Sequence, residues 1–184
     1  MAHALIPTPI GPLSIETTDR GVSRLDFVHE LNGTPVQSRK RDTGAAVLPA
    51  ANGKPPSERA SELIDEATRQ LEEYFAGERS VFDLPLDLHG TPFQMRVWQA
   101  IAAIPYGETL SYAGVALAAG NPNAYRAAGT ACGANRAVIL VPCHRVIGSD
   151  RGLHGFGGGL DTKVWLLRHE STPVTAELAG RLQA

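Results

Sequence analysis

The sequence predicts an α+β protein made of two parts, an antiparallel sheet covered by one helix and then a helical domain. Apolar and polar residues alternate near the N-terminus, an amphipathic helix follows at residues 61–75, and after Gly90 the chain changes to short helices separated by turns. The length of 184 residues suffices for one large domain or two small ones with a core. We therefore expect a first domain at residues 1–89, a second at residues 90–171 and a tail at residues 172–184.

The N-terminal strands are indicated by two short stretches with period-two alternation. Residues 11–15 and 22–27 show this pattern, and Gly21 before the second stretch has turn character. The pattern predicts a hairpin of an antiparallel sheet. Residues 32–57 are rich in glycine, proline, serine and threonine and show no periodicity, so we expect a long, exposed and mobile loop there.

The helix expected to cover this sheet has one apolar stripe at helical spacing and ends at Gly77. Alternation returns at residues 81–88, which we expect to be a strand or an extended connector. At Gly90 the pattern changes to short predicted helices separated by turns, and we place the domain boundary there. The apolar stripe of the helix consists of Leu63, Ile64, Ala67, Leu71, Tyr74 and Phe75.

Three short helices are predicted in the second domain. The first covers residues 91–104, because Thr91 can cap it, a proline follows at the first helical position, and a glutamine stands three residues after the cap. The second covers residues 111–118 with Ser111 as its cap, and the third ends near Cys132. This arrangement indicates a helix-turn-helix, although short alanine-rich helices also occur in many proteins that never meet DNA.

The composition favours a cytoplasmic protein with no membrane association. No segment approaches the roughly eighteen consecutive apolar residues of a membrane span, and the N-terminal segment lacks the basic start and long apolar stretch of a secretory signal. The two cysteines, Cys132 and Cys143, cannot form a disulfide framework, and no second pair at zinc-site spacing accompanies them. In a reducing compartment, a lone thiol needs its own explanation.

The charge is distributed unequally between the two halves. The formal net charge of -2 for the whole chain gives no support for nucleic-acid binding. Residues 1–90 carry 9 basic and 14 acidic side chains (9 − 14 = −5), whereas residues 91–184 carry 8 and 5 (8 − 5 = +3). The basic second half is consistent with a short DNA footprint, and an ordinary mixed surface explains it equally well.

The segment that carries chemistry lies at residues 139–148, where an apolar run predicted as a strand leads into Pro-Cys-His-Arg. Here the sequence resembles the O6-alkylguanine-DNA alkyltransferase family, the methylated-DNA–protein-cysteine methyltransferases, whose active-site signature is Pro-Cys-His-Arg-Val. The resemblance is strong over about residues 80–171 and extends to the N-terminal part only in layout. It implies a ribonuclease H-like layout for the first domain and a winged helix-turn-helix for the second. The further matching motifs are Tyr106-Gly107-Glu108, Ser111-Tyr112, Asn121-Pro122, Ala124-Tyr125-Arg126-Ala127, Gly133-Ala134-Asn135, Gly157-Gly158-Gly159-Leu160 and residues 163–170.

The resemblance implies that Cys143 is the acceptor of the alkyl group. A thiol attacks carbon as a thiolate, and a free thiol with a pKa of about 8.5 is mostly protonated at neutral pH. By resemblance, His144 accepts the thiol proton through a water, and Glu170 holds the imidazole in the correct tautomer. Residues 144 and 170 must then meet in space. For each residue alone, the ordinary alternative is an inert buried cysteine, a surface histidine or a solvated glutamate.

The resemblance implies a structural role for Asn135. Family members use an asparagine at this position to tie the third helix to the segment that carries Cys143.

The resemblance also implies roles in DNA binding. Because O6 of guanine lies within a stacked base pair, the reaction requires that the nucleotide be flipped out of the duplex. By resemblance, Arg126 on the third helix fills the gap left by the base, and Tyr112 acts at the adjacent phosphate and donates to N3 of guanine.

The implied base pocket uses backbone groups. The carbonyls of Cys143 and Val146 accept from the exocyclic amine of guanine, and the amide of Gly157 faces O6. Some relatives carry serine at the position of Gly157, so the missing side chain predicts acceptance of adducts larger than methyl. No cofactor is implied. Some relatives bind zinc through N-terminal cysteine and histidine ligands, but no cysteine precedes Cys132 here, so we expect no metal.

The function implied by the resemblance is DNA repair by direct reversal of damage. The alkyl group of O6-alkylguanine, and also that of O4-alkylthymine, passes to the protein's own cysteine. Because the product is a thioether, which offers water no carbonyl to attack, each molecule is expected to react once. The expected partner is alkylated double-stranded DNA, bound by a monomer, with cooperative binding left open.

Two alternatives belong to other functional classes. A cysteine hydrolase built on Cys143 and His144 would need an oxyanion hole and would turn over repeatedly. A non-enzymatic winged-helix protein would recognise lesions and recruit repair partners, but related lesion binders lack the cysteine. Measuring whether a stable alkyl adduct forms on the protein separates all three.

Overall fold

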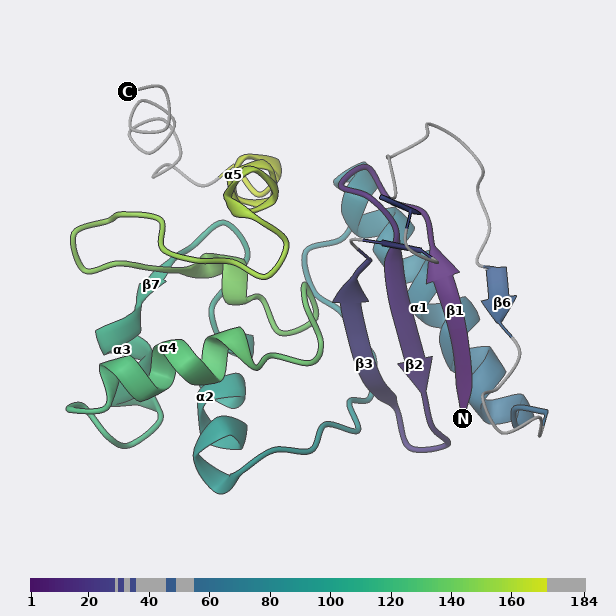
Figure 1. Ribbon diagram of the computed structural model, residues 1–184, viewed down its shortest axis with the longest axis horizontal. Coiled ribbons are helices and arrows are strands. Elements are labelled where there is room, and N and C mark those ends of the chain that lie inside the picture. Colours follow the sequence, from purple (N-terminus) through teal and green to yellow (C-terminus); the bar gives the residue numbers. More distant parts are fainter. Residues whose placement is uncertain (29, 32–33, 36–45, 49–54, 172–184) are drawn as a thin grey trace. The chain divides into compact units, whose positions relative to one another are not determined.

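The part of the chain described by the computed structural model comprises residues 1–28, 30–31, 34–35, 46–48 and 55–171. The chain divides into two units, Met1–His89 and Gly90–Ala184 (Figure 1). The first unit contains β1 (Ala2–Ile6), β2 (Leu13–Thr17), β3 (Val22–Phe27), β4 (Glu30–Leu31), β5 (Thr34–Pro35), β6 (Ala46–Leu48) and α1 (Glu58–Ala76). The second contains α2 (Pro92–Ala102), β7 (Leu110–Ser111), α3 (Tyr112–Ala118), α4 (Tyr125–Gly133), the 3-10 helix η1 (Cys143–Arg145), β8 (Val146–Ile147) and α5 (Leu160–His169).

The first unit is built on an antiparallel sheet with the strand order β3-β2-β1-β6 (Figure 1). Buried and half-buried residues alternate along β1 and β2, as the period-two pattern predicts. Ala4 of β1 pairs with Ile15 of β2, Ile15 pairs with Leu25 of β3, and all three residues are buried. The predicted hairpin and antiparallel sheet are confirmed, and the apolar face of the sheet forms part of the core.

The region expected to be a loop, residues 32–57, is not a loop throughout. The structure places β5 in it, paired with β4, and β6, which is antiparallel to β1. A strand that joins an edge through long-range backbone pairing need not show a local sequence signal. Residues 36–45 and 49–54 lie outside the described residues, so the expectation of mobility there is untested, as is that of a tail at residues 172–184.

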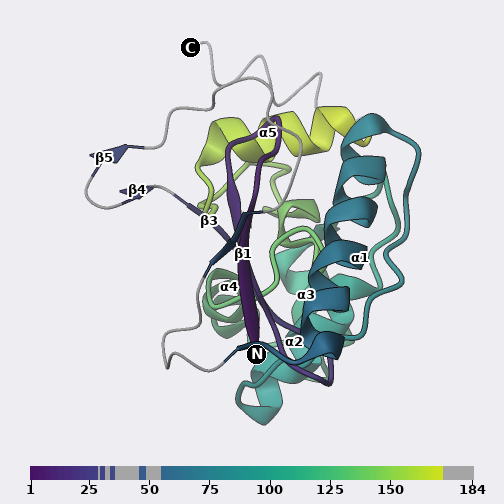
Figure 2. The same ribbon diagram turned by 90° about the vertical axis from the view of Figure 1, so that its right-hand side faces the viewer.

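Helix α1 covers one face of the sheet and packs along β1 and β2 (Figures 1 and 2). Ser57 caps its first turn by accepting from the amide of Ala60, and Gly77 ends it with a left-handed φ of 78°. The predicted helix is confirmed and begins a few residues earlier than expected, because Ser57 is the cap. Its buried residues are Ala60, Leu63, Ile64, Ala67, Gln70, Leu71 and Tyr74.

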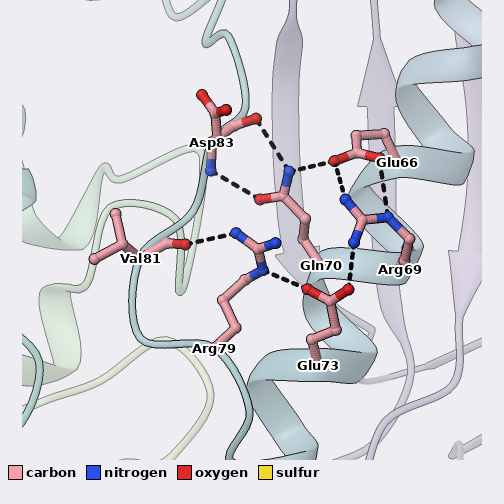
Figure 3. A network of polar contacts seen from close by, with 7 residues as sticks. All are labelled: Glu66, Arg69, Gln70, Glu73, Arg79, Val81 and Asp83. Carbon is pink, nitrogen blue, oxygen red and sulfur yellow. Dashed lines mark hydrogen bonds and ion pairs between the residues drawn. The ribbon is translucent and has the colours of Figure 1, made fainter.

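Residues 81–88 form an extended connector that α1 holds in place. One parallel bridge joins Leu86 to Val22 of β3. The side-chain amide of Gln70 donates to the carbonyl of Asp83 at 3.0 Å, and its oxygen accepts from the amide of Asp83 at 2.8 Å (Figure 3). This two-way hydrogen bond fixes the middle of the connector to the helix without a strand.

Charged side chains extend this attachment (Figure 3). Arg79 donates to the carbonyl of Val81 at 2.8 Å and forms an ion pair with Glu73 at 2.6 Å. Glu73 also contacts Arg69, which forms an ion pair with Glu66 at 2.5 Å. Because Arg69 and Glu66 are well exposed, their pair contributes little to stability.

Two helices of the second unit, α2 and α3, begin at the predicted caps. Thr91 and Gln94 form a complete capping box at the start of α2, and Ser111 caps α3. The indole of Trp98 in α2 donates to the carbonyl of Ala131 in α4 at 2.9 Å, so these two helices are linked in the core. Helices α3 and α4 pack against each other. The predicted helices, and with them the α+β fold class, are confirmed.

The expectation of a strand immediately before Cys143 is wrong. Ile139 has a left-handed φ of 71°, and the amide of Val141 donates to the carbonyl of Ala137 at 2.8 Å, so the chain forms a tight turn. The run is apolar because it is buried, and a short apolar run does not identify the backbone conformation. After this turn come η1 and β8, which pairs in parallel with β7.

Candidate active site

The acceptor expected from the sequence, Cys143, is the first residue of η1 and is 9% exposed. The side-chain amide of Asn135 lies at the end of α4 and donates both to Sγ of Cys143, at 3.1 Å, and to the carbonyl of Val141, at 2.8 Å. The oxygen of the same side chain accepts from the amide of Ala137 at 3.0 Å. Asn135 therefore fixes the turn and contacts the thiol directly.

His144 and Glu170 are both buried and meet in the core of the second unit. Nε2 of His144 lies 2.8 Å from Oε1 of Glu170, although the residues are 26 positions apart in the chain. Nδ1 of His144 is buried and has no hydrogen-bond partner among the residues the structure describes. The imidazole thus has one nitrogen engaged by the carboxylate and the other available for a proton.

Arg145, which had no predicted role, contacts both oxygens of the same carboxylate. Its Nε lies 2.8 Å from Oε2 of Glu170, its Nη2 lies 2.9 Å from Oε1, and its Nη1 donates to the carbonyl of Ile104 at 2.6 Å. The amide of Gly107 also donates to Oε2 of Glu170, at 3.3 Å. The position of Arg145 within the signature was the available signal for this role.

These contacts set the protonation states of the pair. Burial alone would raise the pKa of Glu170, but hydrogen bonds from His144 and Arg145 lower it below its ordinary value. An ionised carboxylate can only accept, so Nε2 of His144 carries a proton and Nδ1 is the basic nitrogen. Burial lowers the pKa of His144, so the imidazole is neutral at neutral pH. This is the form that can take a proton from a thiol.

Tyr112 begins α3, and its ring lies over α4. A Cβ atom added to Gly129 of α4 would lie 3.7 Å from Cδ1 of the ring, an ordinary van der Waals distance, so the ring packs beside this glycine. Burial raises the pKa of Tyr112 to about 12, and negative charge on Cys132 or Cys143 adds to this effect. The phenol therefore keeps its proton at neutral pH and is a potential donor near the thiols.

The remaining predicted site residues occupy different environments. Val146 is buried next to η1, and its amide donates to the carbonyl of Cys143. Gly157 lies between β8 and α5, and a Cβ atom added there would meet nothing within 4 Å. Arg126 is exposed on the first turn of α4. Hydrogen bonds join Asn135 to Cys143 and His144 to Glu170, whereas Arg126 is at the surface.

Lys163 of α5 was not foreseen and is fully buried. Its Nζ donates to the carbonyl of Val146 at 2.7 Å and to that of His154 at 3.3 Å. Burial lowers the pKa of Lys163 to about 8, and negative charge on Cys143 opposes this shift. Lysine is normally exposed, and nothing in the sequence distinguishes this one from a surface residue of an amphipathic helix.

A cysteine is thus followed in the chain by a histidine whose imidazole is held by a carboxylate, which are the residue types of a nucleophile, a base and its orienting group. Among the described residues, no three His, Cys, Asp or Glu side chains are grouped so that they could hold a metal ion. No helix within the same residues is both long and apolar enough to cross a membrane.

Comparison with known proteins gives matches over both units. Residues 92–172 match the DNA-binding domain of 6-O-methylguanine DNA methyltransferase, and residues 1–88 match its ribonuclease-like domain. A methylated-DNA–protein-cysteine methyltransferase of Methanosarcina barkeri is 42% identical over 173 residues, covering 92% of this chain and 97% of the relative. One from Mycolicibacterium paratuberculosis is 46% identical over 176 residues and covers 96% of each chain. A crystal structure of Mycobacterium tuberculosis OGT in complex with DNA superposes with a TM-score of 0.74 and 38% identity, covering 94% of this chain and 96% of the other.

The fold and the site define a two-domain protein in which a helical, DNA-binding domain carries a nucleophilic cysteine. The chain belongs to the 6-O-methylguanine DNA methyltransferase family. The resemblance inferred from the sequence is thereby confirmed, and so is the predicted activity, methyl transfer from methylated DNA to a cysteine of the protein itself.

Proposed function

We propose that Cys143 receives the methyl group and that this protein repairs O6-alkylguanine in alkylated double-stranded DNA by direct reversal. The observation that carries this proposal is the buried pair of contacts at Cys143 and the residue after it: Asn135 donates to Sγ of Cys143, and His144 is paired with Glu170. Nδ1 of His144 accepts the thiol proton through a water, and the thiolate then attacks the alkyl carbon. The C–O bond breaks as the C–S bond forms, and its electron pair goes to the guanine. A hydrogen bond from Tyr112 stabilises the negative charge until the guanine takes up the proton that the thiol gave to His144.

The relay predicts non-additive losses. Glu170→Gln and His144→Ala should each slow reaction with free O6-benzylguanine by about 100-fold, because general-base catalysis typically contributes that much or more. The double variant should be within about threefold of the slower single variant, since the residues act as one unit. Single-turnover rates measure this, and fully multiplicative losses would contradict the relay.

Two controls belong to that experiment. Asp161→Asn removes an exposed carboxylate from the first turn of α5 and should leave the rate unchanged. Glu170→Gln also leaves the buried Arg145 without its counter-ion, so we expect it to lower the free energy of unfolding by about 3 kcal/mol. Rates are therefore compared well below the melting temperature of each variant.

The pH dependence follows from the neutral imidazole. Because burial holds the pKa of His144 below its ordinary value, the base stays unprotonated as the pH falls from 7.5 to 6.5. The rate with free O6-benzylguanine should change by less than about twofold over that range. If hydroxide rather than His144 removed the thiol proton, the rate would fall about tenfold, and that result would contradict the assignment.

We further propose that the base is flipped out of the duplex before it reaches Cys143. Arg126 is exposed on α4, where its guanidinium can fill the gap in the stack, and Tyr112 donates to N3 of the flipped guanine. The carbonyls of Cys143 and Val146 accept from the exocyclic amine. Lys163 uses one lone pair of the Val146 carbonyl and leaves the second for the base.

The open space at Gly157 favours adducts larger than methyl. Gly157→Ser should raise the ratio of the methyl rate to the benzyl rate by about tenfold, because the hydroxymethyl group would occupy room used by the larger adduct. Gly155→Ser is the matched control, since a Cβ atom there also meets nothing within 4 Å. An unchanged ratio in Gly157→Ser, measured on alkylated duplexes, would contradict the proposal.

We also propose the stoichiometry of the reaction, a second substrate, the oligomeric state and the cellular location. The thioether product cannot be hydrolysed as a thioester is, so each molecule reacts once. We infer that O4-alkylthymine, which presents the same alkyl–oxygen bond, is a second substrate, and that the protein acts as a monomer in the cytoplasm.

A further inference from the structure

The exposed side of α4 carries large side chains only at its first turn. Two large side chains project from that turn: Arg126, and Tyr125, which is 49% exposed. The other exposed residues of the helix are small. This face of the helix can therefore come close to the walls of a narrow groove such as the minor groove of DNA. The small residues are Ala127, Thr130 and Gly133.

Tyr125 and Arg126 contact each other. The guanidinium carbon of Arg126 lies 5.7 Å from the centre of the Tyr125 ring, within the range of a cation–π interaction. Among the residues that the structure describes, no carboxylate forms an ion pair with Arg126. The aromatic ring is therefore the neighbour that restrains this guanidinium.

We propose that Tyr125 is a positioning residue for Arg126, which it holds ready to enter the duplex when the base is flipped out. This inference rests on the role proposed above for Arg126. An unrestrained arginine loses much side-chain freedom when it inserts into a stack, and a neighbouring ring reduces that loss before DNA binds. At an exposed site a cation–π contact shifts an equilibrium by roughly two- to fivefold.

A role of Tyr125 in the stability of the protein can be distinguished by experiment from its role in positioning Arg126. Alanine has a higher helix propensity than tyrosine, and Tyr125 is half exposed, so Tyr125→Ala should not lower the melting temperature of the protein. Tyr125→Phe keeps the ring and loses only the hydroxyl. Leu117→Ala is a matched control, because Leu117 of α3 is another large apolar residue of the same domain, 64% exposed.

The test compares single-turnover repair of a duplex containing O6-methylguanine with the reaction of free O6-benzylguanine. We expect Tyr125→Ala to slow duplex repair by about three- to fivefold, whereas Tyr125→Phe and Leu117→Ala change it by less than about twofold. None of the three should alter the reaction with the free base. In an Arg126→Ala background, Tyr125→Ala should have no further effect.

Several results would overturn the inference. They are an unchanged duplex rate in Tyr125→Ala, an equal loss in Tyr125→Phe or Leu117→Ala, an equal loss on the free base, and a full additional loss in the Arg126→Ala background. If Arg126→Ala itself left duplex repair intact, the proposed extrusion role of Arg126 would fail. If Arg126→Ala slowed repair and Tyr125→Ala did not, only the inference about Tyr125 would fail.

Discussion

Replacing Arg126 with alanine should slow repair of alkylated duplex DNA by at least about thirtyfold while barely affecting the thiol chemistry. The inserted guanidinium offsets part of the few kcal/mol that unpairing and unstacking a base cost, and a methyl side chain cannot. Free O6-benzylguanine needs no extrusion, so its reaction with Cys143 should change by less than about twofold.

The two substrates serve as controls for each other. Arg126 is exposed and makes no contact with the buried His144–Glu170 pair, so a general loss of structure is not expected in the variant. Fluorescence of a base analogue placed opposite or beside the lesion reports extrusion directly. Equal losses on duplex and free base would contradict the assignment of Arg126 to extrusion.

Replacing Cys143 with alanine should abolish transfer completely and leave binding to alkylated duplex nearly unchanged. The variant removes the nucleophile, while the exposed side of α4, which carries Arg126, stays the same. Gel-shift or anisotropy titration at a fixed salt concentration measures the affinity, because binding to DNA is strongly salt-dependent. Residual transfer by the variant would place the acceptor elsewhere.

Cys132 is the matched control for that experiment. It is 8% exposed, close to the 9% of Cys143, which in addition accepts a hydrogen bond from Asn135. Burial raises the pKa of Cys132 to about 12, which keeps it protonated at neutral pH and a poor nucleophile. Cys132→Ala should therefore retain full transfer.

The elements that could be predicted from the sequence are those specified by local chemistry. Thr91 with Gln94, and Ser111, cap α2 and α3 through contacts within three residues, so short patterns suffice to locate these helix starts. The His144–Glu170 contact joins residues 26 positions apart, and only the family resemblance indicated it.

The features that sequence reasoning missed depend on long-range packing. The strand β6 exists because it pairs with β1, and the turn at Ile139 requires a left-handed backbone that a short apolar run does not reveal. The packing of α5 on η1 and β8 likewise determines two other features. These are the contact of Arg145 with both oxygens of Glu170 and the burial of Lys163. In each case the residue type is compatible with several environments, and tertiary structure selects one.

The most direct test of the central claim is the stoichiometry and location of methyl transfer. The protein is incubated with excess duplex containing O6-methylguanine, repaired guanine is counted, and the protein is analysed by intact-mass and peptide mass spectrometry. Repair should stop at one equivalent per molecule, with a single methyl group on the peptide that contains Cys143 and none on Cys132, because a thioether gives water no carbonyl to attack. Continued turnover beyond one equivalent, an unmodified protein, or a methyl group on another residue would contradict the mechanism.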